Sequence, residues 1–210
     1  MAHRRSKALQ RKQGKLAERK RFLIYCEGEV TERLYLGAWK RQLRIPGVKF
    51  GSTFGEPLGL VRAAIDHQSR APHSADDQYM AYDHVWCVVD VEAPNPHPGL
   101  ERALVLASRN GVKVALTNPC FELWLMLHLV DHRGYLTTDQ ACRWLEKYGD
   151  CDYSQDAKVF DTEKVLRGYE DARSNALRLT KGSSEADVIR GQNPSSSAWE
   201  FVDKLRRQVE

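Results

Sequence analysis

Short apolar runs alternate with segments of helical periodicity between residues 22 and 130, and this alternation restricts the fold more than any other feature of the sequence. The apolar runs are residues 22–26, 48–54, 85–89 and 112–116. Strands that alternate with helices form parallel sheets, because each crossover helix returns the chain to the same end of the sheet. The sequence therefore predicts an α/β fold with a doubly wound, mostly parallel four-stranded sheet.

Helical spacing of apolar residues follows each of the first three runs. It begins at Val30, at Leu58 and at Leu100. The third of these helices is predicted to end at Asn110-Gly111, since glycine readily adopts the left-handed conformation that closes a helix.

Only helical patterns occur from Thr137 to the end of the sequence. Ser197 and Glu200 have the spacing of a capping box, and the apolar residues that follow lie on one helical face. We therefore predict that residues 131–210 form a helical extension packed on the core of residues 22–130, with no further strand.

Basic residues are concentrated at the start of the chain. Residues 1–21 contain nine Lys or Arg residues and one acidic residue, Glu18, so this segment carries +8 while the whole chain carries +4. The remainder is therefore mildly acidic, at −4. Residues 1–21 are predicted to form a flexible basic arm that either lies along nucleic-acid phosphates or is simply solvated.

Nothing in the sequence predicts a membrane segment. The longest apolar runs, such as residues 123–127, are far too short to span a bilayer, and no apolar stretch follows the basic start. We expect a cytoplasmic protein without a membrane partner.

The five cysteines are Cys26, Cys87, Cys120, Cys142 and Cys151. No pair has CxxC spacing, and the first three fall in apolar runs, where a thiol behaves as a small hydrophobe. A zinc site formed by the last two cysteines with His128 and His132 fits no familiar spacing. We therefore expect buried thiols.

Acidic side chains follow two of the predicted strands. Glu27 follows the first strand, and Asp90 and Glu92 follow the third. The carboxyl ends of parallel strands meet at one edge of a sheet, and residues i and i+2 of an extended segment point the same way. Three carboxylates close together repel unless a hard divalent cation neutralises them. We predict a Mg²⁺ site, or a Mn²⁺ site, at Glu27, Asp90 and Glu92.

Three further residues are expected at the same edge. Gly28 allows the backbone to approach a phosphate closely, so we expect it to contact substrate. Asn118 is predicted to cap the helix after the fourth strand and is our second candidate for substrate contact. Glu122 lies near the start of that helix and is a candidate metal ligand or a group that supports the ligands; the alternative is that it stabilises the helix N-terminus or pairs with an arginine.

The remaining polar and aromatic residues are assigned no part in a site. His128 is interpreted as a core histidine with satisfied hydrogen bonds, and Lys158 as a solvated lysine. The five tryptophans fit core positions better than a base-stacking platform.

Four stretches resemble the RloB family, whose members have a Toprim-like core and are encoded near restriction and phage-defence genes. They are FLIYCEGEVTERLY at 22–35, VVDVE at 88–92, TNPCFELWLMLH at 117–128 and NPSS at 193–196. The resemblance implies a Toprim-like arrangement in which Glu27 acts in acid/base chemistry and the pair Asp90 and Glu92 binds metal. The family typically has Asp-x-Asp at the pair, whereas this chain has Asp-Val-Glu, which lengthens the reach to an ion and keeps the charge.

The resemblance also implies a function and partners. We expect a Mg²⁺-dependent nuclease of a bacterial anti-phage defence system that cleaves RNA or DNA. A separately encoded ATPase is an expected partner, because the chain has no G-x-x-x-x-G-K-[ST] loop of its own. The alternative is a non-catalytic module with a degenerate Toprim-like site that binds nucleic acid or a partner protein. A third and weaker interpretation is nucleotidyl transfer.

Overall fold

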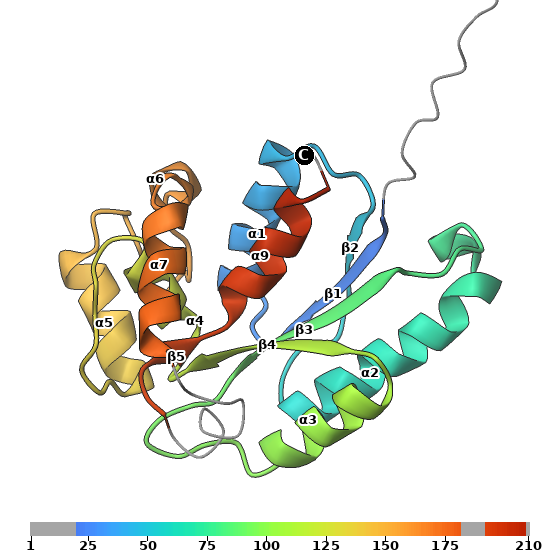
Figure 1. Ribbon diagram of the computed structural model, residues 1–210, viewed down its shortest axis with the longest axis horizontal. Helices are drawn as coiled ribbons and strands as arrows, with labels where there is room; N and C mark the ends of the chain where they lie inside the picture. Colours follow the sequence, from blue (N-terminus) through green and yellow to red (C-terminus); the bar gives the residue numbers. More distant parts are fainter. Residues whose placement is uncertain (1–19, 182–191, 209–210) are drawn as a thin grey trace, which may run out of the picture.

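The computed structural model describes residues 20–181 and 192–208, and these residues form an α/β structure around one five-stranded sheet (Figure 1). The strands are β1 (Phe22–Cys26), β2 (Val48–Phe50), β3 (His84–Asp90), β4 (Lys113–Asn118) and β5 (Ser195–Ser196). Their order across the sheet is β2-β1-β3-β4-β5. The first four strands are parallel, and β5 pairs antiparallel with β4.

Helices cover both faces of the sheet. The helices are α1 (Thr31–Gln42), α2 (Pro57–Arg70), α3 (Leu100–Arg109), α4 (Phe121–Leu127), α5 (Thr138–Tyr148), α6 (Thr162–Arg167), α7 (Tyr169–Leu179) and α9 (Ala198–Arg206), with short 3-10 turns η1 (Ala71–His73) and η2 (Ala75–Asp77). Helices α2 and α3 lie on one face, and α1 and α9 lie on the other (Figure 1). No helix in the described ranges is both long enough and apolar enough to cross a membrane.

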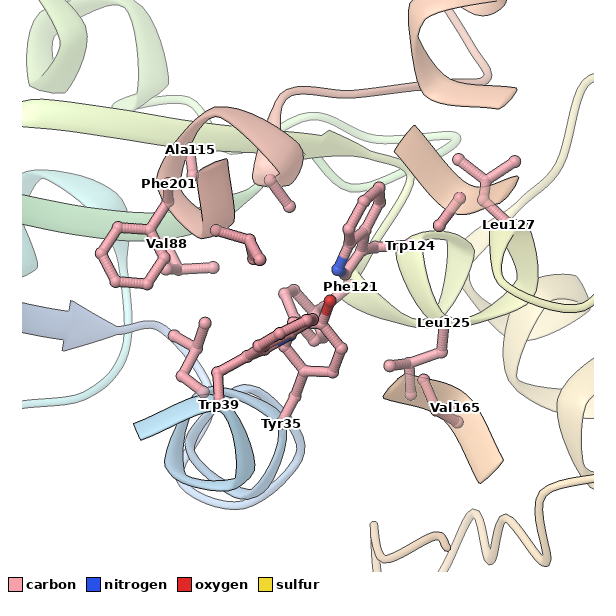
Figure 2. Close-up of a cluster of buried hydrophobic side chains, with 14 of the residues drawn as sticks. Tyr35, Trp39, Val88, Ala115, Phe121, Trp124, Leu125, Leu127, Val165 and Phe201 are labelled. Atoms are coloured by element: carbon pink, nitrogen blue, oxygen red, sulfur yellow. The ribbon is translucent and has the colours of Figure 1, made fainter. Parts of the chain in front are cut away.

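The larger part of the core lies on the α1 side of the sheet. Figure 2 shows Tyr35 and Trp39 from α1 converging with Phe121 and Trp124 from α4. All seven residues of α4 are buried, since this helix contacts α1 as well as α5 and α7. Helix α4, which also contacts β4, therefore joins α5 and α7 to the sheet.

The prediction of four strands and of no strand after residue 137 was wrong. Strand β5 adds a fifth strand, through a bond of 3.0 Å between the hydroxyls of Ser196 and Thr117 and the pairing of Ser195 with Asn118. A strand of two serines has no apolar alternation, so periodicity cannot detect it.

Two predicted helix caps were also wrong. The Ser197 hydroxyl precedes α9 but accepts from the Leu116 backbone N–H, at 2.9 Å, instead of capping the helix. Asn118 ends β4, and the residue that precedes α4 is Cys120. In both cases a side chain that could cap a helix is used to join separate segments of the sheet edge.

The strand order reverses between β1 and β3. The chain passes from β1 outward to β2 and then returns to the other side of β1 for β3 and β4. In such sheets the loops at the carboxyl ends of the strands separate at this reversal and leave room for a ligand. Glu27 and Asp90 lie at these two carboxyl ends.

Candidate metal centre at the carboxyl edge of the sheet

Glu27 and Asp90 are held together by the register of two parallel strands. Cys26 pairs with Val88, and the Glu27 N–H continues the ladder by donating to the Val88 carbonyl at 3.0 Å. The Glu27 Oε2 then accepts from the Asp90 N–H at 3.1 Å. The acid after β1 is thus fixed against the acid that ends β3.

Glu92 reaches the same place through a turn. We expected an extended backbone from Asp90 to Glu92, in which the two side chains point the same way. Instead, strand β3 ends at Asp90, and Glu92 has a φ of +71°. The left-handed conformation costs about 1 kcal/mol or more for a residue with a Cβ. Two hydrogen bonds hold it: the Glu92 N–H donates to the Pro119 carbonyl at 2.8 Å, and the Thr138 hydroxyl donates to Glu92 Oε2 at 2.5 Å.

His97 completes a ligand group that the sequence did not suggest. It lies in the proline-rich loop after β3, and its Nε2 is 2.8 Å from Glu27 Oε1. One ligand atom each from Glu27, Glu92 and His97 lie within 4.8 Å of one another. The position of His97 just beyond a strand end was the one signal available, because the proline-rich segment has no periodicity from which its path could be inferred.

Glu32 is a second site residue that sequence reasoning missed. It lies in the first turn of α1, only 4% exposed, and its Oε1 accepts from the Gly28 N–H at 2.8 Å. Burial, and then the charges of Glu122 and Glu27, raise its pKa to about 7. The Gly28 amide, which we expected to contact substrate, is therefore bonded to Glu32, and a Cβ at Gly28 would collide with the same carboxylate.

Asp90 is the acid of this group with a buried oxygen, Oδ1, that lacks a hydrogen-bond partner in the described ranges. Burial raises its pKa well above the usual range, and the negative charges of Glu32 and Glu27 raise it further. Burial also raises the pKa of Glu27, although the Asp90 N–H and then His97 oppose this shift.

The acidic side chains of this group line a cleft of about 360 Å³, whereas His97 is not part of the lining. Its acidic lining residues are Glu27, Glu29, Glu32, Asp90, Glu92 and Glu122. Lys158 is the basic residue in the lining, and its role was missed because an isolated lysine carries no sequence signal. Carboxylate oxygens and a buried acceptor without a donor suit a hard divalent cation, so the residues present fit Mg²⁺ or Mn²⁺.

Glu122 lies farther along the cleft wall. It is 5% exposed, accepts from the Tyr153 hydroxyl at 2.8 Å and is 3.4 Å from the Lys158 ammonium. It groups with Cys120 and Cys142, whose possible ligand atoms lie within 4.8 Å of one another and of a Glu122 oxygen. Asn118 is not in the cleft lining, and its side-chain oxygen accepts from Asn193 at 3.0 Å.

The expectations for the cysteines and for His128 are confirmed. All five thiols are buried. His128 bonds to the Tyr35 hydroxyl and to the Trp124 carbonyl, at 3.1 and 2.8 Å, and is fully satisfied in the core. The four residues considered for zinc do not form a ligand group in the described ranges, where Cys142 instead joins Cys120.

Comparison with protein-family models gives one assignment. The model described as RloB-like protein matches residues 22–205, which include every residue of the cleft. Searches of curated proteins and of solved structures each found no significant match. The family resemblance drawn from the four sequence stretches is thereby confirmed: the chain belongs to the RloB-like family.

Proposed function

We propose that this protein is a metal-dependent nuclease whose cleft binds Mg²⁺ or Mn²⁺ and cleaves phosphodiester bonds. The observation that carries the proposal is the buried Asp90 Oδ1, which has no hydrogen-bond donor among residues 20–181 and 192–208 and is surrounded by other carboxylates. An arrangement of this kind is costly unless a ligand repays it, since buried charges are normally paired. A divalent cation is the ligand that matches both the charge and the oxygen donors.

Glu27, Asp90 and Glu92 are the proposed ligands. A bound divalent ion supplies charge stabilisation for the transferring phosphoryl group and can activate a water molecule. His97 adds an imidazole nitrogen to the group, and Mn²⁺ accepts a nitrogen ligand more readily than Mg²⁺ does. Either ion also reduces the negative charge that would otherwise repel a nucleic acid.

The pair Glu27 and His97 is suited to move a proton. The raised pKa of the Glu27 carboxylate brings it closer to neutrality, where a general base is most effective. His97, 2.8 Å away, orients that carboxylate and can receive or supply the proton. The Glu27 carboxylate is therefore proposed to accept the proton of the attacking water.

Family membership supports the wider context of the proposal. We propose a Toprim-like core, because the acid after β1 lies beside the acids after β3, which is the placement that the family resemblance implies. We also propose a role in anti-phage defence with a separately encoded ATPase as partner, and RNA or DNA as substrate. Residues 1–19 of the basic arm lie outside the described residues, whereas Lys20 and Arg21 bond to Asp83 and so belong to the folded part. We propose that the arm attracts the substrate backbone.

Cleavage assays on the full chain test the activity. Labelled single- and double-stranded RNA and DNA are incubated with Mg²⁺ or Mn²⁺. We expect Glu27→Gln and Asp90→Asn to slow cleavage by about 100-fold or more, because each removes a group that acts on the reacting atoms or the ion. Glu101→Gln, which changes an exposed acid on α3, is the matched control and should cleave normally. Equal rates for all four proteins would refute the proposal.

A non-catalytic module is the second candidate, and Glu92 favours it. Its carboxylate already accepts from Thr138, and it replaces the usual aspartate of the family pair. Calorimetry separates the two functions: a degenerate site should show no binding of Mn²⁺ that depends on Asp90, whereas the proposed nuclease should lose Mn²⁺ binding in Asp90→Asn.

A further inference from the structure

A thiol-containing ligand group lies on the α4 side of the cleft. One ligand atom each from Cys120, Glu122 and Cys142 lie within 4.8 Å of one another, and the three residues are 1%, 5% and 3% exposed. Two of these residues are cysteines, and both thiols are free and buried. The proposed nuclease chemistry uses neither thiol.

The three side chains come from two packed helices. Cys120 immediately precedes α4, Glu122 lies in its first turn, and Cys142 lies near the middle of α5. Helices α4 and α5 contact each other directly. A ligand bound here would therefore be held by rigid elements, and it would link α4 to its neighbour α5.

A cation and a hydrogen-bond donor beside the cluster already stabilise negative charge on its members. The Lys158 ammonium lies 3.6 Å from Cys142 Sγ and 3.4 Å from Glu122 Oε1, and the Tyr153 hydroxyl donates to the same carboxylate. The Lys158 side chain is 41% exposed, so its ammonium can shift to make room for another cation and still remain beside the cluster.

We propose that Cys120, Glu122 and Cys142 form a binding site for Zn²⁺, separate from the Mg²⁺ or Mn²⁺ site. Zinc binds thiolate sulfur at about 2.3 Å and carboxylate oxygen at about 2.1 Å in tetrahedral geometry, which places ligand atoms roughly 3.5–4 Å apart. The observed group needs to contract by at most about 1.3 Å to meet this geometry.

The charge balance and the ligand chemistry both favour zinc. Two thiolates and one carboxylate around a doubly charged ion leave one negative charge, which Lys158 neutralises. Each thiol loses its proton to solvent on binding, and no electron is transferred. The fourth position belongs to water, because Cys120 and Glu122 line the open cleft. Thiolates select zinc over magnesium, whereas the carboxylates of the neighbouring group prefer the harder ions.

Cobalt substitution tests the site without relying on activity. The full chain is stripped with a chelator under a reductant, supplied with excess Mg²⁺ and titrated with Co²⁺. We expect a near-ultraviolet charge-transfer band from thiolate to cobalt that saturates at one ion per chain and is abolished by stoichiometric Zn²⁺. Cys142→Ser should lose about half of the band or all of it. Cys151→Ser removes another buried thiol and should keep the full band.

Two further variants keep the result interpretable. Glu122→Gln retains both thiols, so it should keep the band but bind Co²⁺ more weakly, even if a cysteine variant does not fold. Glu27→Gln should leave the band unchanged, so a failure of the nuclease proposal does not affect this one. The zinc site is refuted if the folded wild-type protein shows no band, or if folded Cys142→Ser shows the same band as wild type.

Discussion

Asp77 and Asp90 both have buried carboxylate oxygens, but their surroundings differ. Asp77 lies beside the amino ends of β1 and β3, where its carboxylate bonds to Lys49 at 2.7 Å, to His67 at 3.2 Å and to the Tyr82 hydroxyl. Although burial opposes it, these three bonds hold the pKa of Asp77 well below its ordinary value. The protein itself neutralises this charge.

Asp90 shows the opposite arrangement at the carboxyl end of the same sheet. Its Oδ1 has no donor in the described structure, its acidic neighbours include Glu27 and Glu32, and its pKa is raised. A satisfied carboxylate such as Asp77 stabilises the fold, whereas an unsatisfied group of carboxylates destabilises it until a cation binds. The contrast separates a structural acid from a ligand-binding one.

The largest effect is expected from Asp77→Asn. Asparagine cannot form the charge-assisted bonds to Lys49 and His67, and breaking a buried ion pair typically costs about 3–5 kcal/mol of unfolding free energy. Urea unfolding of the variant at pH 7 measures the loss. Asp76→Asn alters the exposed neighbour and should change stability by less than about 0.5 kcal/mol. If both variants unfold at the wild-type urea concentration, the Asp77 network contributes no stability.

The contributions of Glu32, in the cleft, and of Asp77 to the free energy of unfolding should depend on pH in opposite directions. Glu32 has a folded pKa of about 7 against an ordinary value of 4.5, so the folded state holds its proton more tightly than the unfolded state. In the metal-free protein its contribution to stability is therefore present below pH 4.5 and is lost as pH rises to about 7, by roughly 3 kcal/mol. The lowered pKa of Asp77 gives stability that is present above its ordinary pKa of 3.8 and is lost at more acid pH.

Unfolding measured across pH 4–8 with and without Mg²⁺ tests this pattern. Glu32→Gln keeps an acceptor for the Gly28 N–H and should reduce the decline between pH 4.5 and 7, while the raised pKa values of Asp90 and Glu27 maintain the rest of it. Mg²⁺ should flatten the decline in the wild-type protein, because it binds the deprotonated carboxylates. A metal-free protein whose stability rises steadily from pH 5 to pH 7 would contradict the electrostatic description of the cleft.

Asp90→Asn should have a smaller effect on stability, and of the opposite sign to that of Asp77→Asn. Removing an ionisable group from the acidic cluster should raise the unfolding free energy of the metal-free protein at pH 7, since less repulsion remains. The same variant should lose the extra stability that Mg²⁺ or Mn²⁺ gives to the wild-type protein. A metal-free Asp90→Asn protein that is less stable than wild type would show that Asp90 is structural, as Asp77 is.

The parts of this molecule that could be predicted from sequence are those with local causes. The buried strands β1 and β3 are uninterrupted apolar runs, and the acids that follow them, Glu27 and Asp90, meet because parallel strands end at one edge. The second and fourth strands were located for the same reason, although β2 ends at Phe50, four residues earlier than predicted.

The residues that were missed depend on distant partners. Glu32 has the spacing of a residue that stabilises a helix N-terminus, and only the packing of α1 against the sheet shows that it is buried beside other acids. Lys158 enters the cleft from a segment with no strong periodicity, where its φ is +56°. Strand β5 exists only because β4 offers an edge. Contacts of this kind arise from tertiary structure, which local patterns do not encode.

The smallest effect is expected at His97, and it distinguishes two ways in which this residue can act on the cleft. As a direct ligand, the imidazole should favour Mn²⁺ over Mg²⁺, so His97→Ala should weaken Mn²⁺ binding by about 10-fold and Mg²⁺ binding much less. As a partner of Glu27 alone, it should weaken both ions equally, because its loss removes an interaction that lowers the pKa of Glu27. Calorimetry with each ion at pH 7 measures the difference, and His73→Ala, at an exposed histidine, is the control. Equal losses for the two ions would exclude His97 from the ligand set and leave it the role of orienting Glu27.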